Sequence, residues 1–564
     1  MRRISVLIIM LAASWIASAQ SEVDHVLRVI GVHDVEEADA EEVERLTDIL
    51  HNPLKLNMAS RARLEASGLF TPFQIAAVDD YRLRHGDIMS LTELASIDGF
   101  NARIVGDISP FINLDSYSRA SDGVDADISG RSTFKKTDDE HGRVNYGVRS
   151  RLSVNEIWGL SFSCSRGYDD PKWRPSSYSA NVVWNHRYGV LVVGDFNARF
   201  GQGLCLWNTV SFNYLSSPST FMRRASGLSP SYSFTGTNAL TGIAADLCMD
   251  KWKLSCMLGA PEVKSCSSLK LRPAVNLTRR FSFGHIGITH VMDFADVLYE
   301  NYTIPYMRSS ADASLCLKGT NVFGEAMFDW LTGRISYLAG AESSLGEYAT
   351  VAGTVRNLPA SDEHGLALGG EFAGKRHDVL FSSDLVYHPS GKSEAAGKAV
   401  QLKAQAKWKW SISGHMVAEI RVAERIRTWG RRLRTDLRGD LIFDDGTWML
   451  ASRFNVLKSA GVGLLGYVEG AFRCHDALKL YLRQGIFRID IWDDRIYVYE
   501  RDAPSSFNVP AFYGRGVWSS TYLSWKFARW GSLYFRASYI SYPFMKEKKK
   551  PGKAELKLQF SLHF

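Results

Sequence analysis

Polar and apolar residues alternate along the end of the chain. From 554 to 564 every second residue is apolar, and the residues between them are polar or charged. Side chains of a strand point alternately to its two faces, and about ten tilted residues span a bilayer. The pattern therefore predicts a membrane-spanning β-strand with one lipid face and one polar face.

The same alternation recurs beyond about residue 128. One hairpin turns at Asp250-Lys251, and another strand ends at the turn Asp444-Asp445-Gly446. Apolar and aromatic residues on one face, with charged residues on the other, favour a barrel between lipid and a wet lumen over a soluble sandwich. We expect about 20 to 26 strands, a barrel wider than porins, whose lumen is already an aqueous channel. Such a pore needs a filler: the long loops 201–237 and 501–515, the N-terminal region, or a partner.

Residues 1–19 have the pattern of a secretory signal peptide: two arginines, an apolar stretch and a small-residue cleavage site. No later stretch approaches about 18 uninterrupted apolar residues, so no membrane helix is expected. The seven cysteines are scattered singly, which favours small apolar fillers, with room for one disulfide bond, over a metal site.

Charge divides the chain into two parts. Residues 21–115 contain 18 Asp and Glu against 8 Lys and Arg, a net charge of −10. The chain as a whole carries +7 and the signal segment +2, which leaves +15 for residues 116–564. An acidic front and a basic body are two different units.

The acidic front has helical periodicity. A helical segment is expected at 20–53, because Val43, Leu46 and Ile49 share one helical face and Asn52-Pro53 ends the helix. Two helical hairpins follow at 54–114, with turns at Gly68-Leu69-Phe70 and at Gly99-Phe100-Asn101. We expect a linker at 115–127 and the barrel at 128–564.

The 54–114 stretch resembles the tandem helix-hairpin-helix domain of competence-type periplasmic DNA receptors. In that family a hydrophobic-Gly-hydrophobic-Gly hairpin presents backbone N–H groups to a DNA phosphate. Phe70 stands where the second glycine of the first hairpin belongs and Asn101 where that of the second belongs, so the resemblance favours the second hairpin. The DNA contacts that it implies are Gly68, Gly99, Phe100, Asn101, Arg61, Arg63 and Arg103. The acidic charge of the domain works against DNA binding and favours protein contact or pore occlusion.

Two further blocks carry a family resemblance. Gly194-Asp195-Phe196 leading to Phe200-Gly201-Gln202-Gly203, and 495–502 leading to 509–514, resemble blocks in Bacteroidetes-type outer-membrane β-barrel proteins with an N-terminal helix-hairpin-helix domain. The terminal Phe564 resembles the C-terminal signature of outer-membrane barrels. The resemblance implies an outer-membrane location with the N-terminal domain in the periplasm. It places the lysine-rich loop 546–553 outside the cell, where a solvated loop is the favoured interpretation and contact with lipopolysaccharide phosphates or another polyanion is the alternative. Outer-membrane lipid and lipopolysaccharide are the expected partners of the barrel.

No catalytic motif appears in a supportive context, and no cofactor or metal is expected. The predicted fold is α plus all-β membrane: a small tandem helix-hairpin-helix domain followed by a large antiparallel transmembrane β-barrel. The predicted function is non-enzymatic, with the helical module docking a periplasmic protein partner or occluding the pore. A DNA-uptake component and a nutrient channel are the alternatives.

Overall fold

The computed structural model describes residues 22–32, 40–116, 123–139, 141–155, 157–186, 188–207, 214–232, 234, 239–261, 270–294, 306–346, 348–392, 397–430, 433–474, 477–545 and 551–564. The expected signal peptide at 1–19 and most of the lysine-rich loop lie outside these residues.

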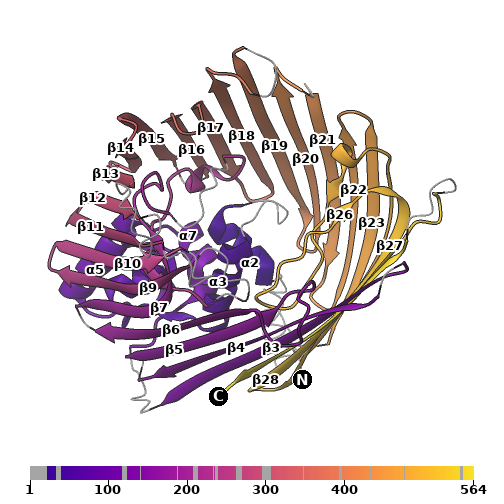
Figure 1. Ribbon diagram of the computed structural model, residues 1–564, viewed down its shortest axis with the longest axis horizontal. Helices are drawn as coiled ribbons and strands as arrows, with labels where there is room; N and C mark the ends of the chain where they lie inside the picture. The colour runs from indigo at the N-terminus through magenta and orange to yellow at the C-terminus, as the bar shows by residue number, and fades with distance from the viewer. Residues whose placement is uncertain are drawn as a thin grey trace, which may run out of the picture.

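The strands close on themselves. In the described part of the chain, 24 strands form one antiparallel barrel. Each strand pairs with the next barrel strand along the sequence, and β29 pairs with β3 to close the ring (Figure 1). The count lies within the predicted range, and the predicted fold class is confirmed. The barrel strands are β3 (Val124–Thr137), β4 (Arg143–Val154), β5 (Trp158–Arg166), β6 (Ser177–His186), β7 (Gly189–Arg199), β9 (Leu240–Met249), β10 (Trp252–Ala260), β11 (Arg272–Phe281), β12 (Gly284–Asp293), β13 (Tyr306–Leu317), β14 (Thr320–Asp329), β15 (Arg334–Leu345), β16 (Ala349–Leu358), β17 (Glu363–Ala373), β18 (His377–His388), β19 (Ala399–Ser413), β20 (Met416–Arg427), β21 (Leu433–Asp444), β22 (Trp448–Lys458), β23 (Val462–Cys474), β24 (Leu478–Ile489), β27 (Gly514–Ala528), β28 (Gly531–Ser541) and β29 (Lys553–His563).

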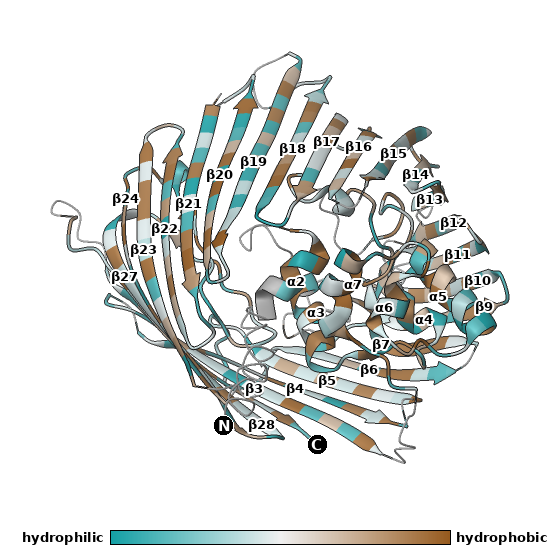
Figure 2. Ribbon diagram, turned by 180° about the vertical axis from the view of Figure 1, so that it is seen from behind, coloured by the Kyte–Doolittle hydropathy of each residue, from teal (hydrophilic) through white to brown (hydrophobic). Residues whose placement is uncertain are grey.

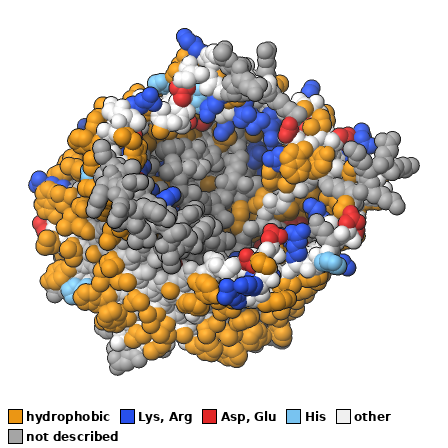
Figure 3. Space-filling view, viewed as in Figure 1, with side chains coloured by type: hydrophobic (Ala, Val, Ile, Leu, Met, Phe, Trp, Pro, Cys, Tyr) orange, Lys and Arg blue, Asp and Glu red, His pale blue; other side chains and the backbone are white. Residues whose placement is uncertain are grey.

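Each strand presents an apolar side to the outside and a polar side to the lumen. On β29, Leu558 is 49% exposed on the outer surface, whereas the neighbouring Gln559 is 1% exposed inside. Apolar side chains cover the exterior in the space-filling view (Figure 3), and the hydropathy colours alternate along the strands (Figure 2). The barrel thus has the polarity of a transmembrane barrel, apolar outward and polar inward.

The two rims of the barrel differ. We call the rim where β3 begins and β29 ends the terminal rim, and the opposite one the distal rim. Connections at the terminal rim are short, such as 250–251 and 318–319, whereas the distal rim carries long connections such as 200–239 and 490–513. Exposed aromatic side chains gather along the terminal rim, as in an interfacial girdle: Trp158, Trp184, Tyr188, Trp252, Phe283, Tyr348, Trp408, Trp410, Phe443, Trp448, Trp525, Trp530 and Phe564.

The N-terminal region folds into short helices around one apolar core. They are α2 (Glu22–Ile30), α3 (Ala40–His51), α4 (Arg61–Ser67), α5 (Pro72–His85), α6 (Leu91–Ala95), α7 (Ala102–Ile108) and η2 (Ser109–Phe111). The two-residue strands β1 (Leu54–Lys55) and β2 (Ile112–Asn113) pair in parallel and bring the two ends of the 54–114 stretch together. Among the described residues, no helix has the length and apolarity to cross a bilayer.

In the 54–114 stretch α4 packs against α5 and α6 against α7, and a turn joins the two helices of each pair. Gly68, in the left-handed conformation at φ 64°, ends α4, and Thr71 and Gln74 form a capping box that begins α5. Ser90 caps α6, but Glu93 accepts a hydrogen bond from the Met89 N–H at 2.8 Å, one residue before the N-cap. Both turns fall where the sequence predicts them.

The barrel begins earlier than expected. β3 starts at Val124, not at 128, because 125–128 pair with β4 and the end of β29. The polar residues Asp125 and Asp127 gave this stretch the appearance of a linker.

The remaining elements belong to the two long distal connections. The first contains η3 (Pro218–Thr220) and β8 (Gly227–Pro230), which pairs with the end of β7. The second contains η4 (Trp492–Asp494), β25 (Ile496–Tyr497) and β26 (Ala511–Phe512).

Candidate functional site: the filled lumen

The helical domain lies inside the ring of barrel strands (Figures 1 and 2). Two contacts place it at the terminal rim: Arg61 donates to the Asp250 carbonyl at 3.2 Å, in the β9–β10 turn, and Asn52 donates to the Asp127 carboxylate at 3.4 Å, near the start of β3. The domain is held to the inner wall by three groups of ion pairs.

The first group is centred on Glu65 of α4. Its carboxylate contacts Lys253 of β10 at 2.7 Å and also pairs with Arg280 of β11, while Lys253 contacts Asp246 of β9 at 2.8 Å. The side chains of Glu65, Lys253 and Arg280 are 12%, 4% and 6% exposed. One acidic side chain of the helical domain thus neutralises cations of two neighbouring strands.

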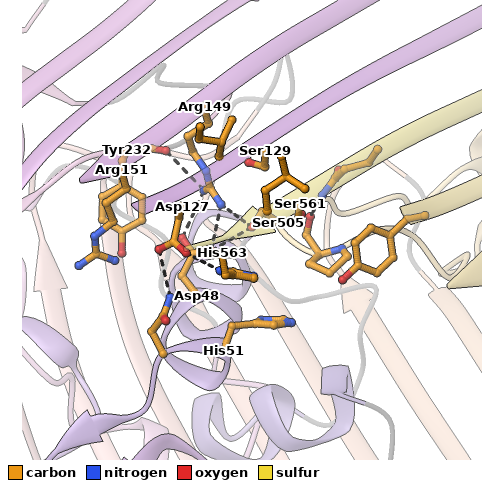
Figure 4. Close-up of a pocket in the computed structure, with 16 residues that line it drawn as sticks. Asp48, His51, Asp127, Ser129, Arg149, Arg151, Tyr232, Ser505, Ser561 and His563 are labelled. Atoms are coloured by element: carbon orange, nitrogen blue, oxygen red, sulfur yellow. Dashed lines mark hydrogen bonds and ion pairs between the residues drawn. The ribbon is translucent and has the colours of Figure 1, made fainter. Parts of the chain in front are cut away.

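The second group is centred on Arg149 of β4. Its guanidinium donates to Glu44 of α3 at 3.0 Å. It also donates to both oxygens of Asp48, on the same helix, at 3.0 and 3.2 Å, and to Ser505 Oγ at 3.0 Å (Figure 4). Ser505 also donates to Asp48 at 3.0 Å, so a distal connection meets the helical domain here. A small pocket lies beside this group, and the pair of His563 and Asp127 lines it.

The third group is centred on Glu371 of β17. It pairs with Arg103 of α7 and accepts a hydrogen bond from Ser217 of the first distal connection. Wall, helical domain and distal connection therefore meet at one carboxylate, as they do around Arg149.

The first distal connection folds into the lumen after β7. The backbone N–H groups of Gln202, Leu204 and Cys205 donate to Glu325 of β14 at 2.7 to 3.2 Å. The glycine-rich block is thus a bend around a wall carboxylate. Further along, Arg224 donates to the Leu69 carbonyl at 3.0 Å, which joins the connection to the first helical hairpin.

The second distal connection also lies against the inner wall. Glu500 accepts hydrogen bonds from Trp518 of β27 at 2.5 Å and from Asn508 at 2.9 Å, and Asp502 pairs with Lys557 of β29 at 2.9 Å. Phe507 packs against the apolar core of the helical domain. The second of the two blocks that carry the family resemblance and the end of the first, Phe200-Gly201-Gln202-Gly203, therefore belong to the distal connections, whereas Gly194-Asp195-Phe196 lies in the wall strand β7.

Burial at these contacts shifts the titration of charged groups. Burial lowers the pKa of Arg61 to about 10 and lowers that of Arg224, because the charged guanidinium loses water. Burial likewise raises the pKa of Asp107, opposed by the nearby Arg28. Arg61 lies where the helical domain contacts the β9–β10 turn, and Arg224 lies where the domain contacts the first distal connection.

The residues predicted to contact DNA fall into two sets. Gly68, Gly99 and Phe100 are in the hairpin turns, where the Phe100 N–H donates to the Ile97 carbonyl at 3.0 Å and the Gly99 carbonyl accepts from Gln74 at 2.8 Å. Asn101 caps α7 through the Ile104 N–H at 2.8 Å.

The basic set is partly occupied by the barrel. Arg61 contacts the β9–β10 turn and Arg103 contacts Glu371, while the backbone N–H of the partly buried Arg63 donates to Ser60 Oγ at 3.4 Å. The structure does not bring these three arginines together as one patch. Contact between this set and DNA stays a prediction.

Sequence reasoning missed the residues that hold the domain in place, above all Glu44, Asp48, Glu65, Arg149 and Lys253. The opposite net charges of front and body were the available signal, but they do not say which acid meets which base. The six described cysteines are unbridged, and the described residues contain no group of three or more His, Cys, Asp and Glu suited to a metal ion.

No protein-family model and no curated protein matches the chain. Among solved structures, the siderophore receptor PirA from Pseudomonas aeruginosa is similar at 8% identity and a TM-score of 0.41, over 79% of this chain and 81% of that one. The translocation pore of the P pilus usher PapC is similar at 8% identity and a TM-score of 0.42, over 78% and 99%. A porin of Rhodopseudomonas blastica is similar at 10% identity and a TM-score of 0.28, over 59% and 99%. The function of this chain therefore has to be argued from its own geometry.

Proposed function

We propose that the protein is a non-enzymatic outer-membrane barrel whose helical domain is a resident plug, which closes the lumen from the periplasmic side. The supporting observation is the set of ion pairs, buried at Glu44, Asp48 and Glu65 and partly exposed at Arg103, through which the helical domain binds the inner wall. A barrel of this width conducts freely unless its lumen is filled. The signal-like N-terminus, short terminal-rim turns and the aromatic girdle support the orientation.

In this proposal the helical domain is a tandem helix-hairpin-helix module that binds a protein. Opening requires undocking, and a periplasmic protein partner that binds the module is the proposed trigger. The two distal connections contact the plug at Ser505, which donates to Asp48, and at Ser217, whose backbone N–H donates to the Gly31 carbonyl at 2.9 Å. Release of the plug therefore also frees these two contacts of the distal connections.

Bilayer conductance of the full-length protein tests this function. The wild type is expected to stay closed, and Glu65→Gln, Arg149→Gln and Arg103→Gln combined are expected to produce openings because all three groups of ion pairs are weakened. A wild-type protein that conducts steadily, as an empty wide barrel would, would contradict the plug.

A further inference from the structure

The inner wall formed by β19, β20 and β21 is rich in cations. Lys and Arg side chains gather on this part of the wall in the space-filling view (Figure 3). The strand register arranges them in two rows across the three strands: Lys403, Arg425 and Arg434 nearer the distal rim, and Lys407, Arg421 and Arg438 nearer the terminal rim. The rows are four residues apart along each strand, or about 13 Å.

The row nearer the terminal rim is neutralised. Lys407 and Arg438 contact Glu419 at 2.8 and 3.0 Å, and Arg421 contacts Asp436 at 3.6 Å. This row is a structural ion-pair network within the wall.

The row nearer the distal rim differs. Lys403, Arg425 and Arg434 are directly opposite one another on neighbouring strands, and no acidic side chain of the described residues forms an ion pair with any of them. Arg425 Nε is buried and has no hydrogen-bond partner in the described part of the chain. Arg427, next to this row, donates to Gln401 at 2.7 Å and stacks over Trp429, so it adds a fourth positive charge without an acid.

Such a row of cations destabilises the barrel wall when no anion is bound to it. Like charges directly opposite on neighbouring strands repel, and a buried donor without an acceptor loses the hydrogen bonds it made to water. An anion that bridged the row would relieve both costs. Guanidinium groups bind phosphate and carboxylate oxygens in pairs, and three strands set the ends of the row about 10 Å apart.

We infer that the row of Lys403, Arg425 and Arg434, with Arg427 beside it, is a binding site for a compact soluble oligoanion at the distal mouth of the lumen. The ligand class is a small molecule with two or three anionic groups spaced over about 10 Å. The site goes beyond the plug, because none of its residues contacts the helical domain in the interactions described above. Binding can therefore be measured whether or not the channel opens.

Isothermal titration calorimetry on the full-length protein in detergent, with inorganic tripolyphosphate at low ionic strength, tests the site. Neutralising Lys403, Arg425 and Arg434 to Gln is expected to weaken binding about tenfold or more, because charge-assisted hydrogen bonds are lost. The matched control neutralises Lys318, Lys375 and Arg376 to Gln, three exposed cations in terminal-rim turns. It should change the affinity by less than about twofold.

Absence of tripolyphosphate binding by the wild type would overturn the inference, and so would an equal loss in the control, which would indicate general charge attraction. Single-stranded oligonucleotide that binds more tightly than tripolyphosphate, and loses more affinity in the triple variant, would replace the small ligand by a nucleic acid. If the triple variant fails to assemble, Arg425→Gln alone provides the same comparison.

Discussion

Replacing Glu65 by Gln is expected to loosen the helical domain. The substitution keeps the shape of the side chain but removes the negative charge between Lys253 and Arg280. Asp246 still faces Lys253 at 2.8 Å, so the uncompensated charge falls mainly on Arg280. Removing one partner of a buried ion pair costs about 3 to 5 kcal/mol, because the remaining charge is left without water or counter-ion.

That cost acts on docking. In the undocked state Arg280 regains access to solvent, so most of the penalty is paid only while the domain is docked. About 3 to 5 kcal/mol raises the undocked population by roughly two to three and a half orders of magnitude. The other two groups of ion pairs still oppose release, so we expect rare openings rather than a permanently open pore.

Two measurements check this expectation. Single-channel recording should show openings that the wild type lacks, and hydrogen exchange should accelerate across 61–108 while barrel strands stay protected. The matched control is Asp80→Asn, which breaks the exposed pair with Arg84 on the same domain and should leave both signals unchanged. Glu65→Gln with wild-type conductance and exchange would refute the claim that this ion pair holds the domain.

Three further outcomes are expected. Arg149→Ala should weaken docking of the helical domain by about 3 kcal/mol or more and produce channel openings. A variant without openings, and with wild-type protection from hydrogen exchange, would count against this expectation. The pKa of Glu93 lies below its usual 4.5, because the Tyr81 hydroxyl donates a hydrogen bond to the carboxylate. The ionised Glu93 therefore stabilises the folded domain above pH 4.5, and this contribution is lost as the pH falls through the lower folded-state pKa. Hydrogen exchange across 89–95 should accelerate in acid, and Glu93→Gln should abolish this pH dependence. Gly68→Ala should destabilise the helical domain by about 1 to 2 kcal/mol, because Gly68 has a φ of 64° and an added Cβ would lie 2.8 Å from Arg45. Gly106→Ala in α7, where an added Cβ meets nothing within 4 Å, should stabilise the domain by up to about 1 kcal/mol. Equal melting temperatures of the two variants would contradict this expectation.

The barrel was predictable because each strand carries its own evidence. Two-residue alternation says which side chains face lipid, and the turns between strands are local, so β9 and β10 could be located from the residues around Asp250-Lys251 alone. The ends of the short helices were predictable for the same reason, since caps and turn glycines act within a few residues.

The lumen contents were not predictable in the same way. Glu65 and Lys253 are 188 residues apart, and nothing near either residue in the sequence identifies the other. A strand pattern says that Lys253 points inward, but its partner depends on where the helical domain docks. The length of the segments 201–237 and 501–515 indicates that they can fill the lumen, but their contacts with Glu325 and through Glu500 depend on the closed ring of strands.

The charge difference between front and body has a physical consequence for the proposed plug. In two of the three groups of ion pairs, acidic side chains of the helical domain meet basic side chains of the wall, whereas in the third Arg103 of the domain meets Glu371. The apolar core of the domain is largely its own, with Phe507 as a contact from outside it. The desolvation of a buried ion pair offsets most of its Coulomb attraction, so such pairs fix orientation strongly while adding little net docking free energy. Replacing buried ion pairs by apolar residues of similar volume is often neutral or stabilising by about 1 to 4 kcal/mol, so an apolar interface of similar size would hold the domain at least as tightly. Docking through ion pairs is therefore compatible with a plug that is seated in one orientation and still releasable by a partner.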